Sequence, residues 1–190
     1  MPSGLELQRL ELDRVPDFFR LHSDPSLDGG WCYCVAWWVP TWEGWGQRSA
    51  VENRALREDL FAAGQLDGYL CYDAGAPIAW CQCGPRDRLP KLCVGYGLEP
   101  APDVWAFTCF LVLPAWRRRG VARHLLDFAL RDLSAQGVRR FQGFPRRGAG
   151  LEDGEAWTGP ESLFRAAGFR PESEGPRGPI YELTLEAATG

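Results

Sequence analysis

The sequence contains no long hydrophobic run, and its first residues lack the basic and then apolar pattern of a secretory signal peptide. No apolar stretch approaches the roughly 18 residues that a membrane-spanning helix requires. Lysine is nearly absent as well, because Lys91 is the one lysine among 21 basic residues. We therefore expect a cytoplasmic protein with no membrane partner.

Charge and composition are those of an ordinary globular protein. The formal net charge is −4 at pH 7, with 45% hydrophobic and 24% charged residues. A general nucleic-acid-binding protein is more often basic, so we expect no nucleic-acid partner. The 190 residues suit one compact core, and no internal repeat or long linker divides them. The prediction is a single domain over residues 1–190.

The cysteines raise the question of a metal or redox site. Seven cysteines, an odd number, in a chain without an export signal indicate reduced thiols. Cys32 with Cys34, and Cys81 with Cys83, could supply four thiolates to zinc, but zinc ligand pairs are usually separated by about two to four residues. Cys81 and Cys83 also lie in a predicted strand and point to one face, where they pack as small hydrophobic residues. We predict no metal site, and keep a cysteine-based zinc or redox protein as an alternative hypothesis.

Hydrophobic periodicity predicts strands and helices in the first half of the chain. Residues 5–10 alternate as a strand does, and Asp13 is placed to cap a short helix after them. Ser49 and Glu52 form a capping box that begins a second helix, which Gly64 ends. A hairpin follows, and then a loop that contains a short strand. The ranges of these last features are 68–83 for the hairpin, 85–102 for the loop and 92–96 for its strand.

The second half opens on a nearly continuous apolar run, residues 104–112, which fits a central strand covered on both faces. A helix with an apolar stripe begins at Val121 and closes at Gly137. The remaining segments are a strand, a flexible acidic loop, a short helix and the last strands. Their ranges are 138–144, 148–154, 162–167 and 169–185. This order predicts an α/β (α+β) fold, a sheet with helices packed on it.

The junction after Pro114 has the properties of an anion-binding site. The first turn of a helix has free backbone N–H groups and a partial positive charge. Gly120 lets a ligand approach the backbone, and the arginines that surround it add formal charge. Together these features suit a pyrophosphate. The alternative is that Arg117, Arg118 and Arg119 form a solvated surface loop.

Residues 112–122, Val-Leu-Pro-Ala-Trp-Arg-Arg-Arg-Gly-Val-Ala, resemble the acetyl-CoA signature of the GNAT superfamily of N-acetyltransferases. Residues 162–169, Ser-Leu-Phe-Arg-Ala-Ala-Gly-Phe, resemble the helix-to-strand segment of the same family. The Trp/Cys-rich residues 31–45 are similar to those of one subgroup. The resemblance covers nearly the whole chain and implies a mixed, mostly antiparallel central sheet with helices on both faces.

The resemblance also implies an activity and a set of site residues. The expected reaction transfers an acetyl group from acetyl-CoA, as cosubstrate, to a primary amine of unknown identity, by direct attack in a ternary complex. The strand edge would bind the pantetheine arm and the helix start would bind the pyrophosphate. The implied cofactor-binding residues are Phe110, Leu111, Val112, Arg117, Arg118, Arg119, Gly120, Val121, Ala122 and Arg123. A homodimer is compatible with the family.

The sequence departs from the family where catalytic groups are expected. Phe164 stands where the family often has a tyrosine acid, and Trp157 where many members have asparagine. The strand of residues 105–112 contains no carboxylate. The catalytic residues are therefore unknown, and the candidates are Ser162, Tyr181, Asp103, Glu161 and His124. A CoA-binding module without turnover is the alternative that these departures leave open.

Five of the nine tryptophans lie in residues 31–45. In the resembled family this segment lines the acceptor side, so these rings would form an aromatic acceptor pocket. The alternative is that they fill the core beneath a long loop.

Overall fold

The computed structural model of the chain describes residues 4–28, 30–39, 41–147 and 156–186. The described strands form one seven-stranded sheet in the order β1-β2-β3-β4-β5-β7-β6. In chain order the elements are β1 (Leu5–Arg9), α1 (Val15–His22), α2 (Ala50–Ala62), β2 (Gly68–Asp73), β3 (Ala76–Pro85), α3 (Pro90–Tyr96), β4 (Val104–Val112), α4 (Val121–Ala135), β5 (Arg140–Gly143), α5 (Glu161–Ala166), β6 (Arg170–Gly175) and β7 (Gly178–Thr184).

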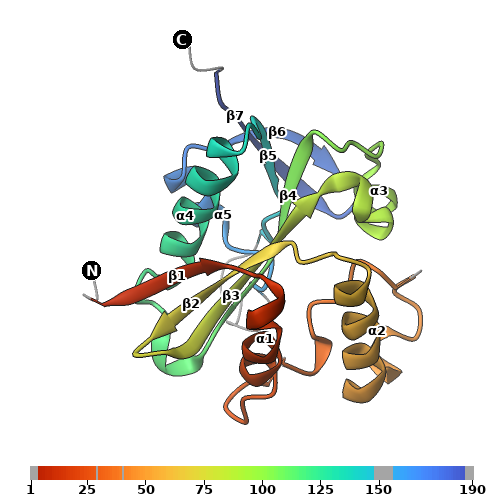
Figure 1. The fold of residues 1–190 in the computed structure, drawn as a ribbon. Coiled ribbons are helices and arrows are strands. Elements are labelled where there is room, and N and C mark those ends of the chain that lie inside the picture. Colours follow the sequence, from red (N-terminus) through yellow and green to blue (C-terminus); the bar gives the residue numbers. More distant parts are fainter. Residues whose placement is uncertain (1–3, 29, 40, 148–155, 187–190) are drawn as a thin grey trace.

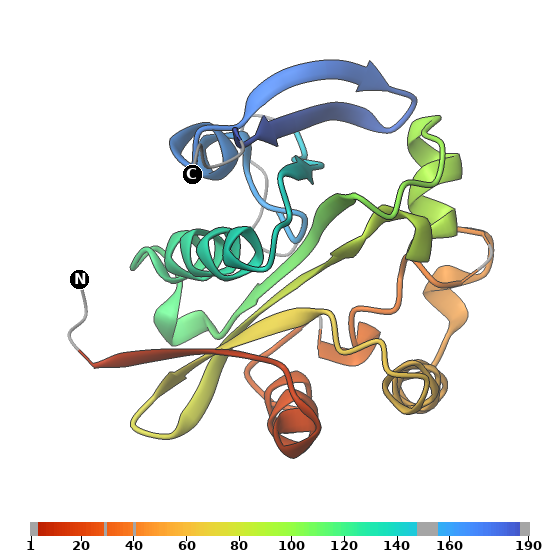
Figure 2. The same cartoon turned by 45° about the horizontal axis from the view of Figure 1, so that its top comes forward.

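The sheet is mixed and mostly antiparallel, as expected. All its neighbouring strands are antiparallel except β4 and β5, which are parallel. Helices α1 and α2 lie on one side of the sheet and α4 and α5 on the other (Figures 1 and 2). The predicted fold class is therefore confirmed. None of the helices in the described part of the chain combines the length and apolar character that crossing a bilayer requires.

Strand β4 is covered on both faces because its side chains divide between two cores, and a register irregularity between Phe107 and Cys109 puts Phe107 and Phe110 on the same face. Phe107 and Phe110 pack in the cluster that contains the buried stripe of α4, including Leu125. Cys109 packs in the cluster of α1 on the opposite face, which contains Phe18. This burial explains why the sequence of β4 is nearly continuously apolar.

The local signals that begin and end several elements are confirmed. The Ser49 hydroxyl accepts from the Glu52 amide (3.2 Å), and the Ser49 amide donates to the Glu52 carboxylate (2.7 Å), so the capping box is formed. Ala74 and Gly75 turn the β2–β3 hairpin with φ of 45° and 77°. Gly168, with φ of 93°, follows α5.

Three sequence predictions are wrong in detail. Residues 92–96 belong to helix α3 rather than a strand, because Leu89, Leu92, Cys93 and Tyr96 bury one helical face. Asp13 caps no helix, since it lies inside a 3₁₀ turn, Leu12–Arg14, and forms an ion pair with Arg14 (3.2 Å). The strand predicted over 138–144 is shorter, Arg140–Gly143. The predicted flexible loop 148–154 lies outside the described residues.

Candidate active site

Strands β4 and β5 separate beyond Phe107. They are paired only from Val104 with Arg140 to Phe107 with Gly143, whereas β4 continues to Val112. The Phe110 amide donates to the Trp157 carbonyl (2.7 Å), so it faces the gap rather than β3.

The remaining β4 residues take alternate sides. Just beyond the end of β4, the Leu113 amide donates to the Ile78 carbonyl on β3 (3.0 Å). Backbone polar groups alternate along a strand, so those of Val112 face the gap with those of Phe110, and those of Leu111 face β3. Of the three predicted pantetheine residues, two therefore direct backbone groups into the gap.

Helix α4 begins at the end of this gap without a side-chain cap. Gly120 occupies the N-cap with φ of 82°, and no described side chain accepts from the first-turn amides. The first intrahelical bond is donated by the His124 amide to Gly120 (3.0 Å), which leaves the earlier amides of the helix without intrahelical partners. Val121, Ala122 and Arg123 line the adjoining cavity, so this helix start is exposed to whatever the cavity holds.

The arginines of the signature have different environments. Arg117 and Arg118 line the cavity, and Arg117 Nε donates to the Val112 carbonyl (3.1 Å). Arg123 also lines it, with its Nε bound to both Asp127 carboxylate oxygens (2.8 Å each). Arg119 instead lies over the Trp116 ring, with Cζ 5.4 Å from the ring centroid, and is not part of the cavity wall.

A cavity of about 920 Å³ runs from this helix start to the Trp/Cys-rich segment. Its far wall consists of Trp31, Trp37, Trp42, Trp45 and Trp157. These rings form a connected group, with centroids 5.3–6.1 Å apart between contacting pairs. The segment therefore contributes to both the cavity wall and the core.

Trp38 contributes to the core rather than to the cavity wall. It turns away from the cavity toward α2, where its indole N–H donates to Gln65 (3.0 Å) and the Arg57 guanidinium lies 4.9 Å from its ring centroid.

A cluster of thiols lies in the wall between the two ends. The sulfur atoms of Cys34 and Cys109 are 3.0 Å apart, and both residues line the cavity. His22 Nδ1 is 2.9 Å from the Phe18 carbonyl, which can only accept, so Nδ1 carries the proton. Burial lowers the pKa of His22 to about 3, and its Nε2 therefore accepts from the Cys34 thiol (3.4 Å).

Burial also raises the pKa of Cys34 well above the ordinary thiol value. Cys34 and His22 are consequently neutral and buried, rather than an ionised nucleophile and base.

The four-thiolate zinc hypothesis is wrong. Cys81 and Cys83 pack in the α4 cluster, whereas Cys34 packs in the α1 cluster on the opposite face of the sheet. Within the described ranges, no three or more His, Cys, Asp or Glu side chains are arranged to hold a metal ion.

Of the three principal catalytic candidates, the structure brings one to the cavity. Ser162, at the start of α5, lines it. Tyr181 donates instead to the Glu161 carboxylate (2.8 Å), and neither residue forms part of the wall. His124 is not in the wall either, although its ring lies close to Gly120.

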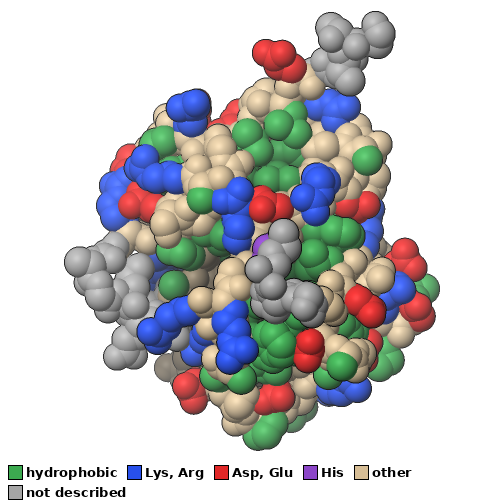
Figure 3. All heavy atoms as spheres, turned by 90° about the vertical axis from the view of Figure 1, so that its left-hand side faces the viewer, with side chains coloured by type: hydrophobic (Ala, Val, Ile, Leu, Met, Phe, Trp, Pro, Cys, Tyr) green, Lys and Arg blue, Asp and Glu red, His purple; other side chains and the backbone are tan. Residues whose placement is uncertain are grey.

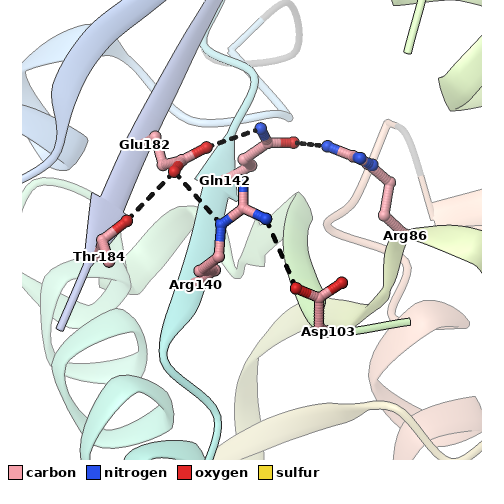
Figure 4. Close-up of polar contacts among 6 residues, drawn as sticks. All are labelled: Arg86, Asp103, Arg140, Gln142, Glu182 and Thr184. Atoms are coloured by element: carbon pink, nitrogen blue, oxygen red, sulfur yellow. Dashed lines mark hydrogen bonds and ion pairs between the residues drawn. The ribbon is translucent and has the colours of Figure 1, made fainter. Parts of the chain in front are cut away.

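Asp103 lies at the opposite end of β4 from the cavity. It accepts from Arg140 (3.4 Å) in a polar network that also contains Gln142 and Glu182 (Figure 4). Gln142 in turn accepts from Arg86 (2.8 Å). These contacts cross-link β5 to its neighbours, so Asp103 has a structural position remote from the candidate site.

Phe164 does not face the cavity. Its ring is fully buried, and a Cβ at Gly143 would lie 2.2 Å from it. A Cβ at Gly159 would lie 3.0 Å from the same ring. The residue that replaces the family's frequent tyrosine therefore fills the core between β5 and the turn before α5.

The wall also contains three charged residues that were not predicted from the sequence: Asp28, Arg146 and Arg177. Asp28 is the one carboxylate residue that lines the cavity within the described residues. These positions come from separate loops and carry no local pattern, so no sequence signal identifies them. On the face that Figure 3 shows, the described basic side chains are interspersed with acidic and apolar ones rather than forming a continuous basic surface.

Comparisons with known proteins identify solved structures with this fold and the family of the chain. The PaiA N-acetyltransferase of Thermoplasma acidophilum, solved with coenzyme A, has a TM-score of 0.59 at 13% identity, covering 96% of this chain and 100% of its own. A GNAT family acetyltransferase of Brucella melitensis, solved with acetyl-CoA, has a TM-score of 0.54 at 11% identity, covering 97% and 90%. The ribosomal-protein-S18-alanine N-acetyltransferase of Escherichia coli has a TM-score of 0.52 at 14% identity, covering 97% of each.

At these identities the structures establish the fold alone, and no curated protein matches the chain. The similarity of the Trp/Cys-rich segment to one subgroup stays a prediction. The sequence pattern of the acetyltransferase (GNAT) family matches residues 31–144, more than half of the chain. The chain therefore belongs to the GNAT acetyltransferase family.

Proposed function

We propose that the protein transfers the acetyl group of acetyl-CoA to a primary amine by direct attack in a ternary complex. The observation that carries this proposal is the single cavity that joins the uncapped start of α4 to the tryptophan wall. A cavity with an anion-binding end and an aromatic end has room for both substrates at once. Family membership and the neighbours solved with coenzyme A or acetyl-CoA support the same cosubstrate.

The diphosphate of acetyl-CoA binds at the helix start in this proposal. The free amides of Val121, Ala122 and Arg123 point at it, and Arg117 and Arg118 add positive charge. Gly120 keeps the approach to the backbone open, since the nearest atom to an added Cβ would be 3.8 Å away. Arg119 adds charge to the same loop.

The pantetheine arm follows the exposed edge of β4. The amide groups of the pantetheine arm pair with the backbone of Val112 and with the carbonyl of Phe110, as an added strand would. The Phe110 amide is already bound to Trp157, and the backbone of Leu111 faces β3, so their share in binding the arm is small. The thioester then lies near Cys109, between the two ends of the cavity.

The attacking amine has to lose a proton, because an alkylammonium has a pKa of about 10.4. Among the described residues, Asp28 has the one carboxylate that lines the cavity, and it accepts this proton through water that links it to the amine. The Ser162 hydroxyl can donate a hydrogen bond to the leaving thiolate of CoA. These roles replace the tyrosine and strand carboxylate that the sequence lacks.

The second candidate is a CoA-binding module without turnover, which the core position of Phe164 favours. Calorimetric titration with acetyl-CoA followed by thiol detection over a panel of primary amines separates the two. Binding with thiol release supports the transferase. Binding without release for every amine supports the module, and absence of binding refutes both.

A further inference from the structure

Three cations lie at the tryptophan end of the cavity, and no carboxylate of the described residues forms an ion pair with any of them. The Arg177 guanidinium, between β6 and β7, lies 4.3 Å from the centroid of the Trp42 ring. The Lys91 ammonium, from α3, lies 3.5 Å from the same centroid. Arg146 lines the cavity with Arg177. None of the ion pairs among the described residues includes any of these three cations.

The burial of Lys91 makes this arrangement costly. The residue is 6% exposed, and its ammonium has no hydrogen-bond partner within the described part of the chain. Burial and the nearby charges of Arg177 and Arg48 lower the pKa of Lys91 to about 8. The faces of Trp42 and Trp45 stabilise a cation but supply no counter-charge.

Arg177 and Arg146 lie close enough to the same tyrosine to affect its pKa. The charges of Arg177 and Arg146 both lower the pKa of Tyr96, although burial raises it overall. Arg177 and Arg146 therefore lie near one phenol, and their planar guanidinium groups are suited to a carboxylate or a phosphate. An anion held there would supply the missing counter-charge.

We infer that the acceptor amine carries a negatively charged group, a carboxylate or a phosphate, that binds Arg177 and Arg146 against the tryptophan wall. This inference rests on the proposed transferase function and names its acceptor class. The apolar part of the acceptor packs on Trp37, Trp42 and Trp157, and its amine extends toward the thioester near Cys109. A neutral or purely cationic amine would leave the cations uncompensated.

Binding is tested without turnover, using the protein saturated with CoA. The probes are 3-phenylpropanoate and 3-phenylpropanamide, which have similar shapes and lack an amine, and the readout is tryptophan fluorescence. We expect the carboxylate to bind at least about tenfold more tightly than the amide. Arg177→Gln and Arg146→Gln should each remove most of that preference. Arg54→Gln, which removes an exposed arginine of α2 paired with Glu58, should keep it.

Turnover is tested with matched amines and CoA thiol detection. L-phenylalanine is compared with L-phenylalaninamide for a carboxylate, and O-phosphotyramine with tyramine for a phosphate. The inference predicts a higher kcat/KM for one anionic member, and a raised KM for that member in Arg177→Gln while the neutral partner is unaffected.

The two proposals fail in different ways. Equal binding of the two probes, or an unchanged preference in both arginine variants, overturns the anion site even if amines are acetylated. Tight, arginine-dependent binding of 3-phenylpropanoate with no thiol release from any amine keeps the anion site and refutes the transferase.

Discussion

Gly120 allows a test of the diphosphate site in which two variants differ only in charge. Its φ of 82° is left-handed, and asparagine and aspartate are the side chains that best tolerate this region. An added Cβ would meet no atom nearer than His124 Nε2 at 3.8 Å, so both side chains fit. Gly120→Asn and Gly120→Asp therefore share their backbone strain, and a difference between them reports the charge.

The expected penalty follows from Coulomb's law. A carboxylate about 5 Å from one phosphate charge is repelled by about 0.8 kcal/mol at the dielectric of water and about 3.3 kcal/mol at an effective value of about 20. Two phosphate charges double these figures, to about 1.7 and about 6.6 kcal/mol. For two phosphate charges, the smaller figure of about 1.7 kcal/mol already corresponds to a loss of more than about tenfold in affinity.

The assay is calorimetric titration of each variant with acetyl-CoA at low and high salt. Gly120→Asn should bind within a few-fold of the natural chain, and Gly120→Asp at least about tenfold more weakly. The gap should narrow as salt screens the exposed charge. Equal affinities of the two variants would show that the phosphates bind elsewhere.

The remaining predictions concern the core around the cavity. Arg57→Met should lower the free energy of unfolding, measured by urea denaturation, by at least about 2 kcal/mol, because the buried Tyr33 and Cys34 carbonyls lose their guanidinium donor. The control Arg54→Met, at an exposed position, should lower it by about 0.5 kcal/mol or less. Similar losses in the two variants would refute this role of Arg57. His22 stays neutral in the folded chain down to about pH 3 but binds a proton below about pH 6.5 when unfolded, so stability falls with decreasing pH in that window. His22 contributes up to about 1.4 kcal/mol per pH unit to the slope of the free energy of unfolding against pH. His22→Phe should remove that contribution, and an unchanged slope in this variant would contradict the prediction. Phe164→Tyr should destabilise by about 1–3 kcal/mol without raising turnover, because the new hydroxyl is buried in the core; faster thiol release would show that the ring reaches the cavity.

The elements that sequence analysis found are those whose signals are local. The capping box of Ser49 and Glu52 satisfies amides within one helical turn, so its effect does not depend on the rest of the fold. The apolar run of β4 needs only that both faces be covered. Helix α3 was missed because Pro90 and Gly97 at its ends are also typical loop residues. Its helical spacing from Leu89 to Tyr96 becomes decisive once that face is seen to be buried.

The two ends of the cavity differ in the same respect. The diphosphate end is one contiguous segment, in which Gly120 and the arginines before it lie within a few residues of the helix start. The acceptor end combines separate loops, since Asp28, Arg146 and Arg177 line one cavity only when β5 and the β6–β7 turn are placed beside the tryptophan segment. Phe164 illustrates the limit of a motif: its position matches the family, but Gly143 and Gly159 admit its ring into the core.

This difference indicates where acceptor specificity resides in the chain. A strand edge followed by a helix start can bind a diphosphate carrier with few side chains, because most of the donors are backbone amides. The acceptor wall depends on side chains, five tryptophan rings and the cations beside them. Trp37 packs with Ala106 of β4 in the core, whereas Trp42 is only partly buried and can change with less effect on β4 or α4. Lys91 and Arg177 contact the same ring from different elements, so exchanging Trp42 would alter the placement of both cations at once. Substitutions at Trp42 should therefore change which amines are accepted before they change the affinity for acetyl-CoA, whereas substitutions at Gly120 should do the reverse.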